Sequence, residues 1–258
     1  MGTSFRDKRV LVTGGTRGLG RSIVELYLND GARVALCARS GESLDAIQEQ
    51  HGSRVIARQV DLMDLDATQG FVSSVVQEWN GLDHVIVNPP HSATVPISQL
   101  TLTDWQKSYE AIYRSMLAVV ETALPSLLRQ EGASVVVISS IAALEPLDVV
   151  PASSVLRGGI AAWVKLMTRE HGPRGVRFNA VEPGYIDTHI VQTGVARTAR
   201  DTGRSPEEVM AELSQPIPLK RFGKPEEVAR AVYFLTSELA SYVSGTCLLV
   251  DGGLVKGV

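Results

Sequence analysis

Short apolar runs alternate with longer amphipathic segments along most of the chain. The apolar runs predict strands at Arg9–Thr13, Arg33–Ala38, Arg54–Val60, His84–Asn88, Ser134–Ser139, Val176–Val181 and Thr246–Val250. Helical periodicity between them predicts helices near 18–30, 41–51, 64–79, 102–130, 153–171 and 225–239. Nearly continuous apolar runs suit strands that are covered on both faces. The pattern therefore predicts an α/β fold with a doubly wound, Rossmann-like sheet of seven parallel strands, in a single domain over 1–258.

One stretch breaks this alternation. After the strand that ends at Val181, about forty residues carry only a weak pattern before the next long helix. They contain one predicted short helix, Pro206–Leu213, with Ser205 as its N-cap and Pro206 at its first helical position. Because a long excursion from the carboxyl end of a strand is commonly functional, we expect 184–215 to form a substrate lid. A mobile surface loop is the alternative.

Composition excludes several classes of function. The 258 residues are 44% hydrophobic, which is ample for a core and excludes a wholly disordered chain. The net charge of −3 gives no bulk attraction for nucleic acid or anionic membrane, and no apolar run approaches the ~18 residues that span a bilayer. Cys37 and Cys247 lie far apart in apolar runs, which indicates free thiols in a reducing compartment and predicts a cytoplasmic protein. The histidines show no metal-ligand spacing, so no metal is predicted.

A glycine-rich turn joins the first strand to the first helix. It reads Thr13-Gly-Gly-Thr-Arg-Gly-Leu-Gly20. Glycines permit a tight turn and a close approach of the backbone to a pyrophosphate, and the helix N-terminus offers it free N–H groups and partial positive charge. The residues expected to bind the cofactor here are Gly14, Thr16, Arg17, Gly18, Leu19 and Gly20.

The Thr-Gly-x-x-x-Gly-x-Gly pattern resembles the short-chain dehydrogenase/reductase fingerprint, and the resemblance covers essentially the whole chain. It implies that Asp61 and Leu62 contact an adenine ring. Pro183, Gly184 and Thr188 resemble the segment that borders a nicotinamide. At the end of the fourth strand, Val87-Asn88-Pro89-Pro90 stands where the family has Asn-Asn-Ala-Gly, so the resemblance places Asn88 at the cofactor.

The end of the second strand predicts which cofactor is bound. Members that prefer NAD place an acidic side chain there for the ribose 2′-hydroxyl. This sequence has Ala38 followed by Arg39, and Arg17 stands in the glycine turn. Because arginine grips a phosphate in bidentate fashion, the pattern predicts NADP(H) in preference to NAD(H). Two solvated surface arginines are the alternative.

The resemblance fails at the catalytic positions. Ser140 matches the family's catalytic serine, but thirteen residues later Ser153 stands where the tyrosine belongs, and Arg157 stands in the lysine position. Ile112 occupies the slot of the relay asparagine. The following helix keeps the family register through Trp163, which indicates substitution and not misalignment. The resemblance leaves Arg157 able to bind a cofactor ribose, as the lysine does.

These replacements change the available proton chemistry. A phenol titrates near 10 and can be tuned downward, whereas a serine hydroxyl is a far weaker acid and an arginine stays charged. General acid–base help contributes roughly 10²–10⁴ in rate, so carbonyl reduction without a replacement acid should be slow. Candidate replacements are Tyr185, Tyr113 and His91, each with a structural role as the alternative. Further neighbours of the expected pocket are Glu145, Asp148, Glu182 and His189.

Three functions therefore stay open. The first is an NADP(H)-binding oxidoreductase that acts on a small carbonyl or alcohol substrate with Ser140 as the surviving polar anchor. The second is a non-redox lyase, isomerase, cyclase or hydrolase on the same scaffold, and the third is a catalytically silent, cofactor-binding pseudoenzyme. The resemblance also implies pairing through 104–130 and 153–171 into a homodimer or homotetramer.

Overall fold

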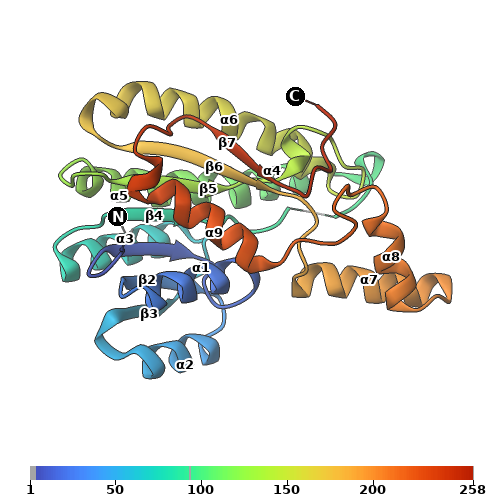
Figure 1. The fold of residues 1–258 in the computed structure, drawn as a ribbon, viewed down its shortest axis with the longest axis horizontal. Coiled ribbons are helices and arrows are strands. Elements are labelled where there is room, and N and C mark those ends of the chain that lie inside the picture. The colour runs from blue at the N-terminus through green and yellow to red at the C-terminus, as the bar shows by residue number, and fades with distance from the viewer. Residues whose placement is uncertain (1–3, 93, 258) are drawn as a thin grey trace.

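A seven-stranded, fully parallel sheet runs through the centre of the computed structural model, which describes residues 4–92 and 94–257 (Figure 1). Its strands are β1 (Arg9–Thr13), β2 (Arg33–Ala38), β3 (Val55–Gln59), β4 (His84–Val87), β5 (Ser134–Ile138), β6 (Arg177–Pro183) and β7 (Cys247–Val250). Their order is β3-β2-β1-β4-β5-β6-β7. The chain thus winds outward from β1 in one direction and from β4 in the other. This confirms the predicted doubly wound α/β fold.

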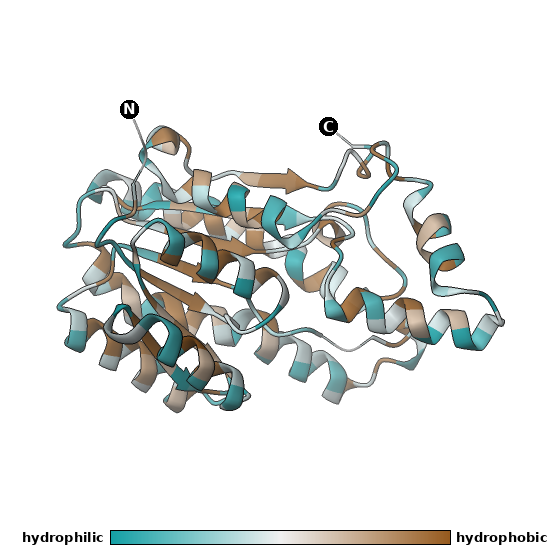
Figure 2. Cartoon of the chain, turned by 60° about the horizontal axis from the view of Figure 1, so that its bottom comes forward, coloured by the Kyte–Doolittle hydropathy of each residue, from teal (hydrophilic) through white to brown (hydrophobic). Residues whose placement is uncertain are grey.

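Helices cover both faces of this sheet. The α-helices of the described chain, whether or not they cover the sheet, are α1 (Gly18–Asn29), α2 (Glu42–His51), α3 (Leu65–Trp79), α4 (Leu102–Tyr109), α5 (Ser115–Leu127), α6 (Pro151–His171), α7 (His189–Thr202), α8 (Pro206–Ser214) and α9 (Pro225–Thr236). Alternate strand residues point to opposite faces, so one core packs under α3, α5 and α6 and the other under α1, α2 and α9. The apolar strands lie inside and the polar helix positions face outward (Figure 2). Over the described residues, no helix is both long and apolar enough to cross a membrane.

Two elements differ from the sequence prediction. The helix predicted over 102–130 is divided into α4, a π-helical segment, Glu110–Arg114, and α5. The weak pattern before residue 206 predicted no helix there, whereas α7 fills His189–Thr202. The apolar contact of α7 is small, since Val195 and Ala199 meet Val209 of α8 in a separate minor core. Because α7 has so few buried apolar residues, its helical periodicity is weak in the sequence.

The short helix predicted from its cap is confirmed as α8 (Pro206–Ser214). The Ser205 hydroxyl accepts a hydrogen bond from the Glu208 amide at 3.1 Å, and the Glu208 carboxylate accepts one from the Ser205 amide at 2.8 Å. This reciprocal capping box satisfies two amides that would otherwise lack partners. The 184–215 segment is therefore largely a pair of packed helices, α7 and α8, which extends from the side of the sheet (Figure 1).

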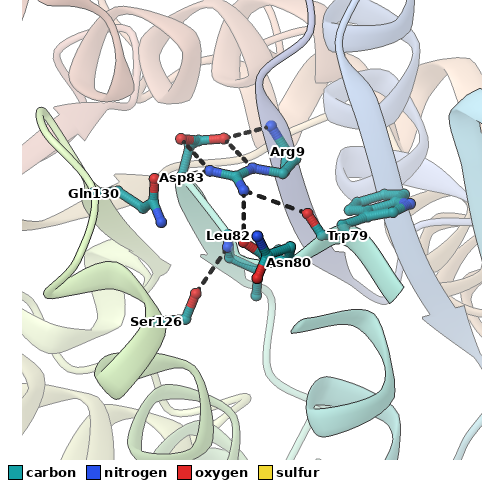
Figure 3. A network of polar contacts seen from close by, with 7 residues as sticks. All are labelled: Arg9, Trp79, Asn80, Leu82, Asp83, Ser126 and Gln130. Carbon is teal, nitrogen blue, oxygen red and sulfur yellow. Dashed lines mark hydrogen bonds and ion pairs between the residues drawn. The ribbon is translucent and has the colours of Figure 1, made fainter. Parts of the chain in front are cut away.

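An ion pair joins β1 to β4 at the amino-terminal edge of the sheet (Figure 3). The Arg9 guanidinium donates to both carboxylate oxygens of Asp83, at 2.8 and 3.0 Å, and to the carbonyl oxygens of Trp79 and Asn80 and the side chain of Gln130. Burial acts to raise the pKa of Asp83. The hydrogen bonds and charge of Arg9 outweigh it, so that the pKa lies below its ordinary value.

We expect Asp83→Asn to lower the free energy of unfolding by about 3 kcal/mol at pH 7, because it leaves the arginine without its counter-charge. A carboxyl whose pKa is depressed on folding stabilises fully above its unfolded pKa, near 4, and loses that contribution as the pH falls further. The variant should therefore lose less stability than the wild type between pH 5 and 3. Urea denaturation at each pH measures both effects. Glu25→Gln, which breaks an exposed pair with Arg21, is the control and should change little. Equal losses in the two variants would contradict the account.

Candidate cofactor and substrate site

The glycine turn closes tightly between β1 and α1. Gly14 and Gly18 have φ angles of +64° and +52°, which favour glycine. A Cβ on Gly20 would lie 2.0 Å from the carbonyl oxygen of Gly14, so only glycine lets the first turn of α1 pack onto the loop. Arg17 is the N-cap of α1 and makes no side-chain cap, and the first turn carries no acidic residue. The turn thus presents free amides and positive charge, which suits a pyrophosphate.

The carboxyl ends of β1 and β4 are tied together beside this turn. The Thr13 hydroxyl accepts a hydrogen bond from the Asn88 amide at 2.8 Å and donates to the Asn88 carbonyl oxygen at 3.3 Å. A Cβ on Gly14 would lie 3.1 Å from the Asn88 side-chain nitrogen. These contacts place Asn88 at the point where the strand order reverses, which is where ligands bind in open α/β sheets. Sequence reasoning missed the role of Thr13, although it opens the glycine fingerprint.

The predicted adenosine-side residues follow β2 and β3. Arg39 follows β2 directly and is exposed, as is Arg17. The Arg39 carbonyl oxygen accepts a hydrogen bond from Gln59 at 2.9 Å, which fixes the backbone at that point. Asp61 is exposed and its carboxylate accepts from the Met63 amide at 3.0 Å, whereas Leu62 is buried in the core. All of these lie at the carboxyl edge of the sheet, as the glycine turn does.

The predicted nicotinamide border comes from the end of β6. Pro183 pairs with Val250 of β7, and the Gly184 amide donates to the Val250 carbonyl oxygen at 3.0 Å. A Cβ on Gly184 would lie 2.8 Å from the Cα of Asp251, so this passage needs glycine. The Thr188 side chain lies 3.6 Å from the position of a Cβ on Gly18. The structure thus brings the start of the 184–215 segment to the glycine turn.

Ser153 and Arg157 form a buried pair on the first turns of α6. Arg157 is only 6% exposed, and its Nε donates to Ser153 Oγ at 2.9 Å while Nη1 donates to the Ile138 carbonyl oxygen at 2.8 Å. The second bond connects α6 to the carboxyl end of β5, two residues before Ser140. Burial lowers the pKa of Arg157 to about 10, and no neighbouring charge offsets that effect. The guanidinium stays protonated at neutral pH.

Both serine hydroxyls already act as hydrogen-bond acceptors. Ser153 Oγ accepts from Arg157, and Ser140 Oγ accepts from the Ala142 amide at 3.2 Å. Each hydroxyl therefore keeps its own proton free to donate to another oxygen. Ile112, in the relay slot, is completely buried in the core and supplies no polar group. The residues that meet at the carboxyl end of β5 can thus donate hydrogen bonds to a carbonyl oxygen.

The three candidate replacement acids lie in different surroundings. The Tyr185 ring stacks on Phe222 with 5.6 Å between ring centroids. His91 is exposed, but desolvation by its surroundings lowers its pKa, and the charges of Arg157, Arg17 and Arg39 lower it further. The effect of these three arginines shows that His91 lies near both the predicted 2′-phosphate site and the predicted catalytic residues.

Tyr113 points elsewhere. A Cβ on Gly159 would lie 2.2 Å from the Tyr113 hydroxyl oxygen, so this hydroxyl rests against the outer side of α6. Residues two apart do not share a helix face, which separates this contact from Arg157. Burial and the stacked Tyr109 ring raise the pKa of Tyr113. The structure does not bring Tyr113 together with the two serines.

We expect Gly159→Ala to destabilise the protein by about 1–3 kcal/mol, because the new methyl group overlaps the Tyr113 hydroxyl. Gly158→Ala is the matched control: its Cβ would lie 3.7 Å from the nearest heavy atom, and alanine favours a helix over glycine by up to ~1 kcal/mol. Adding Tyr113→Phe to Gly159→Ala should restore most of the loss. Thermal denaturation measures all three variants. Similar stabilities for the two single variants would refute this placement of Tyr113.

The four acidic or histidine neighbours expected at the pocket have distinct environments. The Glu145 carboxylate accepts from the Lys256 amide at 2.6 Å, and Asp148 and His189 are exposed. Glu182 is buried on β6, where burial raises its pKa and a hydrogen bond to Cys247 lowers it less. Its Oε2 atom has no partner among the described residues, which the sequence did not predict.

The main hollow found in the described chain lies outside this site. This hollow, of about 790 Å³, opens at the amino-terminal end of the sheet, where Arg177 and His84 contribute to its wall. Arg177 is bound to backbone carbonyl oxygens and His84 to Ser134, so their polar groups are engaged within the protein. In residues 4–92 and 94–257, no group of three His, Cys, Asp or Glu side chains is arranged to hold a metal ion.

Comparisons with known proteins agree with this arrangement. A family model described as Enoyl-(Acyl carrier protein) reductase matches residues 14–255. The 3-oxoacyl-(acyl-carrier-protein) reductase of Aquifex aeolicus is 30% identical over 258 residues, which cover 98% of this chain and all of that protein. The L-sorbose reductase of Gluconobacter frateurii, solved with NADPH and L-sorbose, superposes with a TM-score of 0.94 at 26% identity over 100% of both chains.

A second solved structure also superposes on almost the whole chain. It is an NADPH-bound short-chain oxidoreductase from Pseudomonas aeruginosa PAO1, described as containing an atypical catalytic center. It is 30% identical, with a TM-score of 0.88, over 98% of this chain and 100% of its own. The match of the family model over nearly the whole chain, together with the sheet order and the glycine turn, shows that this protein belongs to the short-chain dehydrogenase/reductase family.

Proposed function

We propose that this protein is an NADP(H)-dependent oxidoreductase that interconverts a small carbonyl compound and its alcohol without a tyrosine acid. The observation that carries the proposal is the intact cofactor cradle. Gly20 closes onto Gly14, Thr13 ties Asn88 beside the turn, and Thr188 reaches Gly18. Segments that follow β1, β4 and β6 thus come together beside the glycine turn, and a Cβ at position 20 would clash with the backbone of that turn. Such a cradle fits a pyrophosphate and supports redox chemistry over a non-redox role.

Preference for NADP(H) follows from the end of β2. Arg39, which follows β2, and Arg17, in the glycine turn, are both exposed, and Ala38 leaves no carboxylate to bind a ribose 2′-hydroxyl. Two guanidinium groups suit a 2′-phosphate. The two solved relatives described above contain NADPH, which supports the same choice.

The chain's own residues would act on the substrate oxygen. A bound nicotinamide cofactor supplies the hydride. The hydroxyls of Ser140 and Ser153 donate hydrogen bonds to the carbonyl oxygen, and Arg157 positions Ser153 by donating to its Oγ. The charge of Arg157, held in a poorly hydrated site, stabilises negative charge that develops on that oxygen. The proton itself would come from water, His91 or Tyr185, so we expect a rate roughly 10²–10⁴ below that of a site with a general acid.

The second candidate is a silent, cofactor-binding protein, which the loss of tyrosine, lysine and asparagine favours. The Pseudomonas relative supports catalysis instead, because it is described as an oxidoreductase despite its atypical center. We also propose a homodimer or homotetramer. Exposed apolar side chains on the outer faces of α4 and α6 would be covered by such pairing: Leu102, Tyr109, Val155 and Leu166.

Fluorescence titration tests the cofactor part of the proposal. We expect NADPH to bind at least ~10-fold more tightly than NADH, since charge-assisted hydrogen bonds contribute about 1.5–3 kcal/mol. Arg17→Met with Arg39→Met should remove most of that difference, and it should weaken NADPH binding far more than NADH binding. Arg129→Met, at an exposed arginine after α5, is the control. Equal or tighter binding of NADH to the wild type would overturn the preference.

A further inference from the structure

Arg157 is a buried cation whose hydrogen-bond donors are only partly used by the described residues. A guanidinium has five N–H donors. Two of them bind Ser153 Oγ and the Ile138 carbonyl oxygen, and the other three, one on Nη1 and two on Nη2, have no partner among the described residues. The side chain is nevertheless 94% buried, since 6% is exposed. A buried cation with unused donors is costly unless an anion or other acceptor meets it.

No carboxylate in the described part of the chain neutralises this cation. Arg157 takes part in no ion pair within residues 4–92 and 94–257. Of the acids expected near the pocket, Glu145 accepts from the backbone of Lys256, Glu182 bonds to Cys247 and Asp148 is exposed, and none of them pairs with Arg157. Burial alone accounts for the lowered pKa of Arg157. Since the described residues supply no counter-charge, an anion from outside the chain is suited to this position.

The surroundings of Arg157 are also positive. Arg157 lies two turns into α6, whose N-cap, Val150, makes no side-chain cap and whose first turn contains no acidic residue. Ser153 thus lies in the first turn of this 21-residue helix, where the helix dipole is positive. The charges that act on His91 are those of Arg157, Arg17 and Arg39, all positive. A cofactor phosphate would be bound by Arg17 and Arg39, whereas Arg157 lies with the predicted catalytic residues and would still lack an anion.

We propose that Arg157 binds a carboxylate of the substrate, so that the substrate pair is an oxo acid and the corresponding hydroxy acid. This inference rests on the proposed function, because it takes the substrate to lie beside Ser140 and Ser153. The planar guanidinium fork matches two carboxylate oxygens, which an ammonium group at this position would not. Reduction would add a hydride from NADPH to the carbonyl carbon and a proton to its oxygen, and the carboxylate would stay unchanged.

Paired ligands that differ only in charge test this inference. Calorimetric titration of the NADP⁺-saturated protein compares pyruvate with pyruvamide and acetoacetate with acetoacetamide. We expect the better acid to bind about 10- to 100-fold more tightly than its amide. Arg157→Met should abolish that ratio, and Arg157→Lys should keep part of it. Arg230→Met, at an exposed position on α9, should leave the ratio unchanged. A melting curve of each variant confirms that it is folded.

The outcomes separate this inference from the proposed function. Equal binding of acid and amide by the wild type, or a ratio that survives in Arg157→Met, overturns the carboxylate site. If Arg157→Met weakens NADP⁺ binding but keeps the ratio, Arg157 serves the cofactor and only the inference is lost. If the wild type binds no NADP(H), the proposed function fails, and the same titrations on the cofactor-free protein decide the inference by the same ratio.

Discussion

Gly20→Ala should weaken NADPH binding by about 100-fold or more, because its methyl group would lie 2.0 Å from a backbone oxygen of the phosphate-binding turn. Neither the Gly14 carbonyl nor the first turn of α1 can move without displacing the amides that we propose to bind the pyrophosphate. The loss of two charge-assisted hydrogen bonds alone corresponds to about 3 kcal/mol or more, which is a factor above 10² in the dissociation constant. Fluorescence titration of the folded variant measures the effect.

Substitutions of two other glycines should have smaller effects and serve as comparisons. Gly18→Ala has room, with its Cβ 3.6 Å from Thr188, but its φ of +52° strains an alanine, so an intermediate loss is expected. Gly70→Ala on α3 has no heavy atom within 4 Å of its Cβ and should bind NADPH as the wild type does. Circular dichroism confirms folding in each case. A Gly20→Ala protein that binds NADPH like Gly70→Ala would show that this turn does not hold the cofactor.

Restoring the family's catalytic residues should raise the rate of carbonyl reduction by roughly 10²- to 10⁴-fold, which is the usual contribution of a general acid. The variant combines Ser153→Tyr, Arg157→Lys and Ile112→Asn. The phenol would supply the proton, and the lysine would lower its pKa. Steady-state oxidation of NADPH with a panel of small ketones and aldehydes measures the gain.

The control for this gain replaces the phenol by a ring that cannot donate a proton. Ser153→Phe with Arg157→Lys and Ile112→Asn keeps the shape and the buried asparagine, whose cost at the fully buried position 112 is then equal in both variants. We expect no rate increase from it. Equal rates in the two triple variants would mean that the wild-type site was not limited by a missing acid.

The sheet and the glycine turn could be predicted because their signals are local. Strands covered on both faces read as apolar runs, and a turn that admits only glycine at Gly20 appears directly in the sequence. The short α8 was predictable from Ser205 and Pro206, whereas α7 was not, because Val195 and Ala199 bury only a small apolar surface against α8. Elements whose signals lie in neighbouring residues could therefore be predicted from the sequence.

The candidate site was only partly predictable, since its key contacts join distant segments. The sequence located Ser153 and Arg157 by counting, but it could not show that Arg157 also donates to the Ile138 carbonyl oxygen on β5. It could not orient Tyr113 either. The π-helical segment 110–114 changes the angle per residue, so an ideal helix extended from α4 misplaces side chains beyond it. Tyr113 consequently faces Gly159 and not the serines.

The central claim is that this altered site still transfers a hydride. It is tested most directly by incubating the wild-type protein with NADPH deuterated at nicotinamide C4 and a panel of small carbonyl compounds that includes oxo acids. Mass spectrometry then follows deuterium into the alcohol product. We expect one deuterium on the carbinol carbon, with transfer maintained in Tyr113→Phe and strongly reduced in Arg157→Met. Saturating binding of the labelled NADPH without deuterium transfer to any compound of the panel would contradict the account and favour a silent, cofactor-binding protein.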